Sequence, residues 1–174
     1  RRIYDKLSWN KATHVRLDAD EWVKSGTWSS ITTERTVFEP LYSNEKYHQS
    51  TVANSYVEIT VPDGVSNFAF ICMRDANFDT LTVTLNGGSI ASYGNSTVNC
   101  NRTRLTVNEI GNPFHTEQYI GLPAGNNVIR ISKGNNTNVA AIWGGFYWNG
   151  NTLMVYNVAH GGKTMRRLYN DFMQ

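Results

Sequence analysis

The stretch SYVEITVPDGVSNFAFICMR, from Ser55 to Arg74, reads as two β-strands joined by a turn. In its first half, apolar residues alternate with polar or aromatic ones, which is typical of a strand with one buried face. The apolar set is Val57, Ile59 and Val61. Pro62, Asp63 and Gly64 have the chemistry of a turn. Residues 67–74 are apolar on both faces, so we expect a central strand there.

The same pattern continues toward the C-terminus. In TLTVTLNGG, residues 80–88, Leu81, Val83 and Leu85 alternate with threonines, and Asn86-Gly87 favours a hairpin turn. Further strands are expected in RLTVNEI, EQYIGLP, NVIRISK and AAIWGGFYW. About eight or nine short strands without intervening helices predict an all-β fold, an antiparallel jelly-roll or Greek-key β-sandwich.

The two ends of the chain depart from this pattern. Residues 1–25 show no sustained period, so we expect an irregular segment with room for a short helix over 18–24. Residues 26–150 form the predicted sandwich. Residues 151–174 predict a strand, a turn and a short C-terminal helix, because Met165, Leu168 and Phe172 have helical spacing. Since the chain starts at Arg1 without Met, we expect it to be part of a longer protein.

The composition argues against several classes of function. A chain of 174 residues with 40% apolar and 17% charged residues fits one globular domain. A net charge of +2 without basic clusters does not favour nucleic-acid binding. The longest apolar runs are too short to predict a membrane span. Cys72 lies in an apolar strand, which favours a buried thiol, and its pairing with Cys100 stays open.

Aromatic residues near the end of the sandwich are candidates for sugar binding, because a pyranose stacks on an aromatic ring while amides bond its hydroxyls. Strand alternation in AIWGGFYWNGN assigns Ile142, Phe146 and Trp148 to the core, which leaves Trp143 and Tyr147 as ligand-binding candidates with Asn149 beside them. The alternative is that both faces are buried, with Trp143 under a neighbouring domain. Tyr93, in a predicted loop, is a fourth ligand-binding candidate.

A metal site is not expected. DANFD, residues 75–79, resembles the opening of a calcium loop, but Thr80 and Asn86 stand where that loop needs Gly and an acid. A turn with hydrogen-bonded aspartates is therefore favoured. The histidines and cysteines lack the spacing of metal ligands, and we expect no cofactor.

The segment NVAHGGKT, Asn157 to Thr164, resembles the second conserved block of the SGNH (GDSL-type) esterase family. Asn157, Gly162 and Thr164 match that block, and Ala159 replaces its first glycine. The resemblance implies a catalytic role for Gly162 as an oxyanion-hole donor. The other motifs of the family, G-D-S, G-x-N-D and D-x-x-H, are missing from this sequence. We therefore do not expect the chain alone to be an enzyme, and leave open whether its parent is an esterase.

Residues 28–149 resemble the jelly-roll, carbohydrate-binding-like modules that accompany or interrupt SGNH esterases in secreted bacterial enzymes and phage tail proteins. This resemblance implies a non-catalytic module that binds a glycan or cell-surface polysaccharide. It also implies an extracellular or virion location and a covalently linked esterase domain, and leaves a homo-oligomeric parent open. Two alternatives remain: a fragment of the esterase itself that contributes Gly162, and a structural spacer of a tail fibre.

Overall fold

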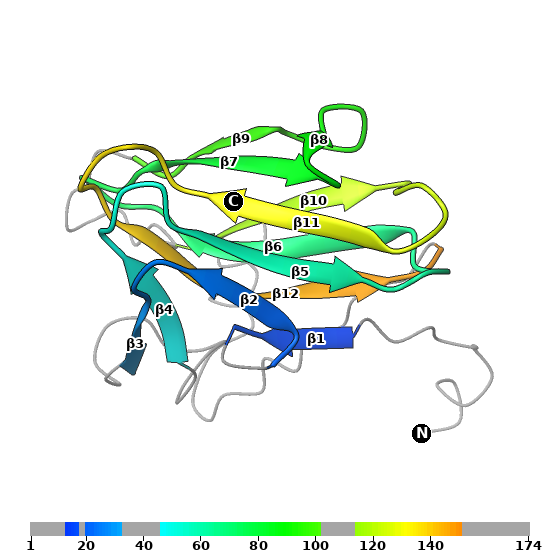
Figure 1. Ribbon diagram of the computed structural model, residues 1–174, viewed down its shortest axis with the longest axis horizontal. Helices are drawn as coiled ribbons and strands as arrows, with labels where there is room; N and C mark the ends of the chain where they lie inside the picture. Colours follow the sequence, from blue (N-terminus) through cyan, green and yellow to red (C-terminus); the bar gives the residue numbers. More distant parts are fainter. Residues whose placement is uncertain (1–12, 18–19, 33–45, 102–113, 151–174) are drawn as a thin grey trace, which may run out of the picture.

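The computed structural model describes residues 13–17, 20–32, 46–101 and 114–150. These residues form two antiparallel sheets packed face to face, and they contain no helix (Figure 1). The prediction of an antiparallel β-sandwich is confirmed. The expected C-terminal helix and the Asn157–Thr164 block lie outside the described residues.

The first sheet, here called sheet I, has the strand order β10-β6-β12-β4-β3, and β1 also pairs with β12. Its strands are β1 (Thr13–Arg16), β3 (Ser29–Thr32), β4 (Lys46–Ser50), β6 (Asn67–Met73), β10 (Phe114–Ile120) and β12 (Ala140–Trp148). β6 lies between β10 and β12, so it is central, as its apolar residues on both faces predicted.

The second sheet, sheet II, has the order β2-β5-β11-β7-β8, and β9 also pairs with β7. Its strands are β2 (Trp22–Ser25), β5 (Tyr56–Val61), β7 (Thr80–Leu85), β8 (Gly88–Ser89), β9 (Thr97–Asn99) and β11 (Asn127–Ser132). β7 and β8 form the predicted hairpin, in which Asn86 and Gly87 have φ angles of 50° and 76°. Two consecutive positive φ angles are those of the type I′ turn that Asn-Gly favours.

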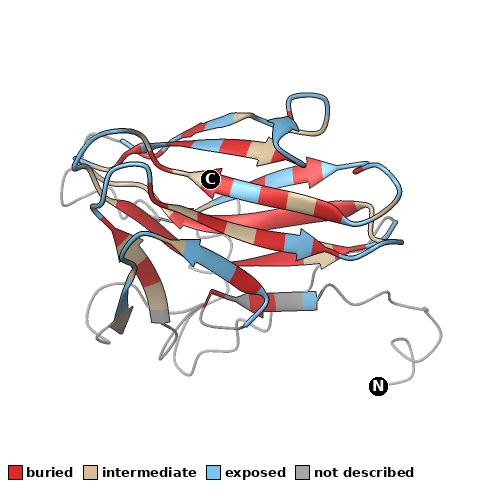
Figure 2. Ribbon diagram, in the orientation of Figure 1, coloured by how far each residue is buried: buried red, intermediate tan, exposed pale blue. Residues whose placement is uncertain are grey.

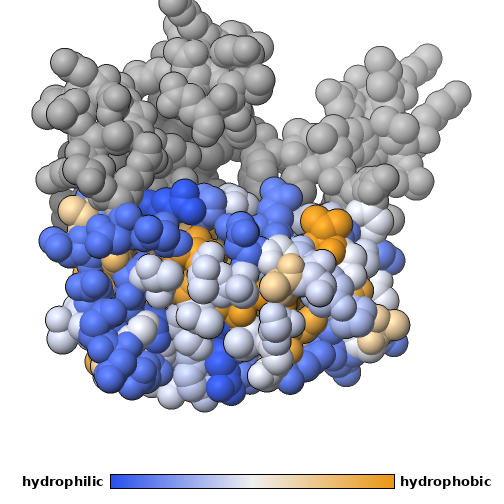
Figure 3. Space-filling view, turned by 90° about the horizontal axis from the view of Figure 1, so that it is seen from above, coloured by the Kyte–Doolittle hydropathy of each residue, from blue (hydrophilic) through white to orange (hydrophobic). Residues whose placement is uncertain are grey.

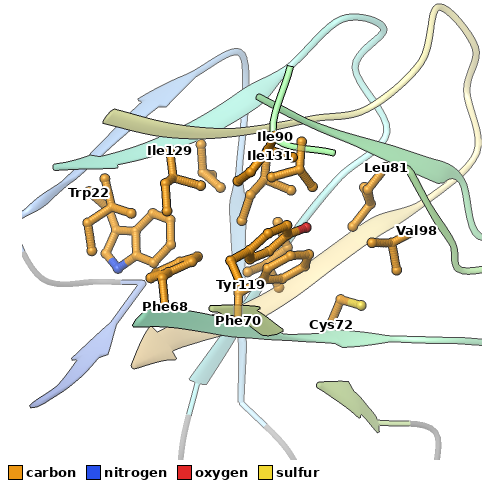
Figure 4. Close-up of a cluster of buried hydrophobic side chains, with 14 of the residues drawn as sticks. Trp22, Phe68, Phe70, Cys72, Leu81, Ile90, Val98, Tyr119, Ile129 and Ile131 are labelled. Carbon is orange, nitrogen blue, oxygen red and sulfur yellow. The ribbon is translucent and has the colours of Figure 1, made fainter. Parts of the chain in front are cut away.

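The main core lies between the two sheets. Strands of sheet II bury alternate residues, whereas β6 and β12 are buried along almost their whole length (Figure 2). Figure 4 shows Phe68, Phe70 and Tyr119 of sheet I directed toward Ile129 and Ile131 of sheet II. The predicted inward residues of β5 and β7 are all buried. Alternation therefore located the core correctly wherever one face of a strand meets solvent.

The expectation of an irregular segment or a short helix before residue 26 is wrong for the described part of that segment. β1 pairs with β12, and β2 pairs with β5. Trp22 of β2 is buried, and its indole N–H donates to the Val15 carbonyl at 3.3 Å. Each strand has only four residues, so neither shows a measurable period. Pairing at the sheet edge, rather than local pattern, makes them strands.

A close approach of the chain requires glycine at position 94. A Cβ there would lie 2.5 Å from the Gln118 carbonyl oxygen and 2.7 Å from Cδ1 of Tyr119. At Gly88, in contrast, a Cβ would meet only the Leu85 carbonyl oxygen, at 3.6 Å. We expect Gly94→Ala to lower the free energy of unfolding by about 2–3 kcal/mol, because backbone and a core ring must move.

Gly88→Ala is the matched control, with an expected change within about 0.5 kcal/mol. Urea titration of both variants, followed by tryptophan fluorescence, measures the difference. Equal midpoints for the two variants would contradict the close contact between residue 94 and β10.

Candidate functional site

Trp143 and Tyr147, predicted to share one face of β12, lie on opposite faces of it. A β-bulge interrupts the pairing of β12 with β6: Ile142 lies opposite Cys72 and Gly144 opposite Ile71, so β12 has one extra residue at this point. An extra residue reverses the alternation of every side chain that follows it. The predicted division of β12 into two faces is therefore wrong beyond the bulge.

Trp143 consequently lies with Phe146 and Trp148 on the outer face of sheet I. Its side chain is 2% exposed, and its ring centroid is 4.9 Å from that of Tyr47. Tyr147 instead packs, partly buried, against the core between the sheets. The structure thus separates Trp143 from Tyr147, and a ring as buried as that of Trp143 offers no open face for stacking. For Trp143, this burial agrees with the alternative that both faces are buried.

In the sequence, the glycine pair of β12 indicates this bulge. A Cβ at Gly145 would lie 2.8 Å from Cε2 of Phe68 and 3.0 Å from the Ala69 carbonyl oxygen. Glycine inside a strand pattern often marks a bulge or a close backbone approach. Reading Gly144-Gly145 in this way would have corrected the alternation.

The structure brings the other two candidates, Tyr93 and Asn149, to the same end of the sandwich. The loop from β10 to β11, the turn from β5 to β6 and the end of β12 meet there (Figure 1). The amide of Ile120 donates to the Tyr93 carbonyl at 3.0 Å. The next amide, of Gly121, donates to Oδ1 of Asn67 at 3.2 Å, and Nδ2 of Asn67 donates to the Gly150 carbonyl at 3.0 Å. We call this group the β10–β11 corner; its members are Ser66, Asn67, Tyr93, Ile120, Gly121 and Asn149.

Hydrogen bonds hold the polar part of the corner in place. The Ser66 hydroxyl donates to Oδ1 of Asn149 at 3.0 Å, and the Leu122 amide donates to the Ser66 carbonyl at 2.7 Å. Asn149 is exposed, so its amide lies at the surface beside a hydroxyl group. Such an amide and hydroxyl pair can exchange hydrogen bonds with sugar hydroxyls without a large change of conformation.

A buried polar network fixes the loop that carries Tyr93. Glu117 of β10 accepts a hydrogen bond from Nδ2 of Asn95 at 2.8 Å and contacts Nε2 of His115 at 2.9 Å. The Tyr119 hydroxyl donates to the Asn95 carbonyl at 2.9 Å. Burial raises the pKa of Tyr119, and the nearby Glu117 raises it further, so this hydroxyl stays protonated and keeps donating. The loop is therefore held against β10 on both sides of Gly94.

Of the corner residues that the sequence analysis did not single out, Ile120 is the large apolar one. Its side chain is 53% exposed, although it is large and apolar. It lies on the outward-facing side of β10 together with Thr116 and Gln118, which are polar and exposed. A large apolar residue on the same strand face as two polar residues can be recognised in the sequence and indicates an exposed apolar contact. Most of the described surface in Figure 3 is hydrophilic, with apolar residues as separate spots.

The opposite end of the sandwich contains a buried ion pair. Asp79 Oδ1 accepts from the Thr80 amide at 2.8 Å and from Nδ2 of Asn136 at 2.9 Å, and Oδ2 accepts from the Gly134 amide at 2.8 Å. Nζ of Lys133 lies 3.3 Å from Oδ2. Burial raises the pKa of Asp79, but the hydrogen bonds together outweigh burial and lower it.

This arrangement agrees with the predicted turn of hydrogen-bonded aspartates. The described residues contain no cluster of three or more His, Cys, Asp or Glu side chains arranged to hold a metal ion. Among the same residues, no helix is long and apolar enough to span a membrane.

Comparison with known proteins identifies the architecture. No protein-family model and no curated protein matches the sequence. A family 35 carbohydrate-binding module from an environmental isolate superposes with a TM-score of 0.51 at 13% identity, over 80% of this chain and 93% of the module. The C-terminal family 22 module of a Clostridium thermocellum protein gives 0.51 at 12% identity, over 85% and 99%. The chain has the jelly-roll fold.

A third match is an exo-β-1,3-galactanase from Phanerochaete chrysosporium, with a TM-score of 0.50 and 16% identity over 79% of this chain. The jelly roll described here spans about 29% of the length of that enzyme. The predicted jelly-roll fold is therefore confirmed at the level of architecture, with two matched modules that consist almost wholly of this fold.

Proposed function

We propose that this jelly roll is a non-catalytic module that binds a glycan at the β10–β11 corner. The observation that carries the proposal is that exposed Ile120, half-buried Tyr93 and the exposed amide of Asn149 all lie at one end of the sandwich. The fold supports it, because carbohydrate-binding modules share this architecture over nearly their full length.

The mechanism is non-covalent. The apolar C–H faces of sugar rings along the glycan pack on Ile120 and on the accessible part of Tyr93, while Asn149 and Ser66 exchange hydrogen bonds with its hydroxyls. Because so small a contact gives weak affinity, tight retention requires several copies of the module or a repeated ligand. The ligand we propose is therefore a surface polysaccharide rather than a free monosaccharide.

The module works within a larger extracellular or virion protein that includes an SGNH-type esterase domain. The motif from Asn157 to Thr164 supports this part of the proposal, with Gly162 as the oxyanion-hole donor. These residues lie outside the described part. The sequence of the parent gene tests the linkage: we expect a G-D-S motif before Arg1 and a G-x-N-D motif after Gln174. Flanks without either motif would contradict it.

Glycan-array binding of the whole chain, beside a p-nitrophenyl acetate assay, tests the proposed function. We expect retention on a defined glycan without turnover. Ile120→Thr and Asn149→Ala should each weaken this binding by about tenfold, because each removes one apolar contact or one hydrogen bond.

Val52→Thr is the matched control. Val52 is 43% exposed and lies between β4 and β5, at the other end of the sandwich (Figure 1). It should leave binding unchanged. Full retention by both corner variants would refute the assignment of the site, and no binding by the unmodified chain would refute the function.

A further inference from the structure

Two buried thiols from different sheets meet inside the sandwich. Cys72 belongs to β6 of sheet I, and Cys100 directly follows β9 of sheet II. Their sulfur atoms are 3.5 Å apart, and both residues are free and buried. Figure 4 shows the Cys72 side chain directed into the core near Val98. The predicted burial of Cys72 is confirmed, and the structure adds the nearby sulfur of Cys100.

We propose that Cys72 and Cys100 form an intersheet disulfide when the chain folds in an oxidising compartment. A disulfide has an S–S length of about 2.05 Å, so the sulfurs must approach by roughly 1.5 Å. The two cysteines are 28 positions apart in sequence, and the bond would link the sheets covalently near one end of the core.

The backbone at both positions is already fixed for this bond. The Cys100 amide donates to the Asp79 carbonyl, and its carbonyl accepts from the Asp75 amide, both at 3.1 Å. Cys72 is paired on both sides, with Ile142 of β12 and His115 of β10. Because these bonds hold the backbone at both positions, rotation of the two side chains has to supply most of the approach of the sulfurs.

The surroundings of Cys100 favour its thiolate, which is the reactive form. The hydrogen bond between the two thiols lowers the pKa of Cys100, burial opposes this, and the positive charge of Arg74 lowers the pKa again. The pKa of Cys72 is raised by its hydrogen bond with Cys100 and by burial.

The reaction is thiol–disulfide exchange with glutathione disulfide as the oxidant. The thiolate of one cysteine attacks one sulfur of the oxidant, whose S–S bond breaks, and a glutathione thiolate leaves. The other cysteine then loses its proton, and its thiolate attacks Sγ of the first cysteine and displaces the second glutathione thiolate. Two electrons pass from the cysteine pair to the oxidant, and two glutathione thiols result. Because both cysteines are buried, the exchange precedes closure of the sheets or requires local opening.

Oxidative refolding of the whole 174-residue chain tests the proposal. After refolding in a glutathione redox buffer, the monomer should lose about 2 Da in mass and show no thiols to Ellman's reagent in denaturant. Its melting temperature should exceed that of the dithiothreitol-treated chain by roughly 5–10 °C. Folded reduced protein should react slowly with Ellman's reagent, because both thiols are buried.

Cys72→Ala and Cys100→Ala are the controls, each compared with itself with and without dithiothreitol. Neither melting temperature should respond to the reductant, whatever the cost of the substitution. Two titratable thiols after oxidative refolding, a glutathione adduct, or disulfide-linked dimers in place of the bridged monomer would each overturn the proposal.

Discussion

Replacement of Asp79 by alanine should lower the free energy of unfolding by about 3–5 kcal/mol, because it leaves a buried ammonium group without its counter-charge. The side chain of Lys133 is fully buried, and among the described residues its Nζ would keep only neutral oxygens, such as the Asn136 carbonyl at 2.6 Å. The amides of Thr80 and Gly134 lose their acceptor as well. Urea denaturation at neutral pH measures the loss.

Two further variants distinguish the stability lost with the buried ion pair from the general effect of a substitution. Glu58→Gln breaks the more exposed pair between Glu58 and Arg130 and should cost less than about 1 kcal/mol. Combining Asp79→Ala with Lys133→Met removes both buried charges and should recover part of the loss. A loss in Asp79→Ala no larger than that in Glu58→Gln would contradict the role of the buried pair.

Because of the Asp79 carboxylate, we expect the folding stability to depend on pH. The pKa of Asp79 is lower in the folded chain than its ordinary value. The stabilisation from this shift is complete above the ordinary pKa of an aspartate, about 3.9, and disappears as the pH falls through the lower folded value. Stability should therefore decline below about pH 4. Asp79→Asn should decline less steeply over that range, and an identical slope would contradict the shift.

Trp143→Ala should also lower the free energy of unfolding by about 3–5 kcal/mol. The indole is buried on the outer face of sheet I among Tyr47, Phe146 and Trp148, and truncation leaves a cavity there. The folded fraction should still bind the glycan that the unmodified chain binds. Thermal unfolding and array binding of one preparation give both results.

Trp28→Ala is the matched control, because Trp28 is half-buried and its indole N–H bonds to the nearby Ser25 carbonyl at 3.0 Å. We expect it to cost roughly half as much as Trp143→Ala. The opposite pattern, in which Trp143→Ala is stable but loses glycan binding, would restore Trp143 as a stacking residue.

Strands with a solvent face could be predicted well from the sequence. β5, β7 and β11 follow their apolar alternation, and the hairpin after β7 follows from Asn86-Gly87. β1 and β2 could not be predicted, because four residues contain too little pattern and their hydrogen bonds go to strands far along the chain. Strand identity at a sheet edge depends on a partner that local sequence does not contain.

The candidate site was predicted in part. Tyr93 and Asn149 stay predictions as ligand-binding residues; the structure places them at the same end of the sandwich, where exposed Ile120 also lies. Trp143 and Tyr147 were wrongly assigned to one face, because the bulge in β12 changes the direction of every later side chain. The alternation rule assumes an uninterrupted strand, whereas β12 has an extra residue at the bulge, and beyond it Gly145 lies close to the Phe68 ring of neighbouring β6.

The sequence by itself determined the class of fold, since alternation and turn residues are local properties that each segment carries alone. Only the tertiary structure decided which strands are neighbours, on which face Trp143 lies and which polar groups meet. The meeting of Cys72 with Cys100 and of Asp79 with Lys133 was decided in the same way. These contacts join positions 28 or more residues apart. The first exists only after the two sheets have packed, and the second only after β7 and β11 have paired within sheet II.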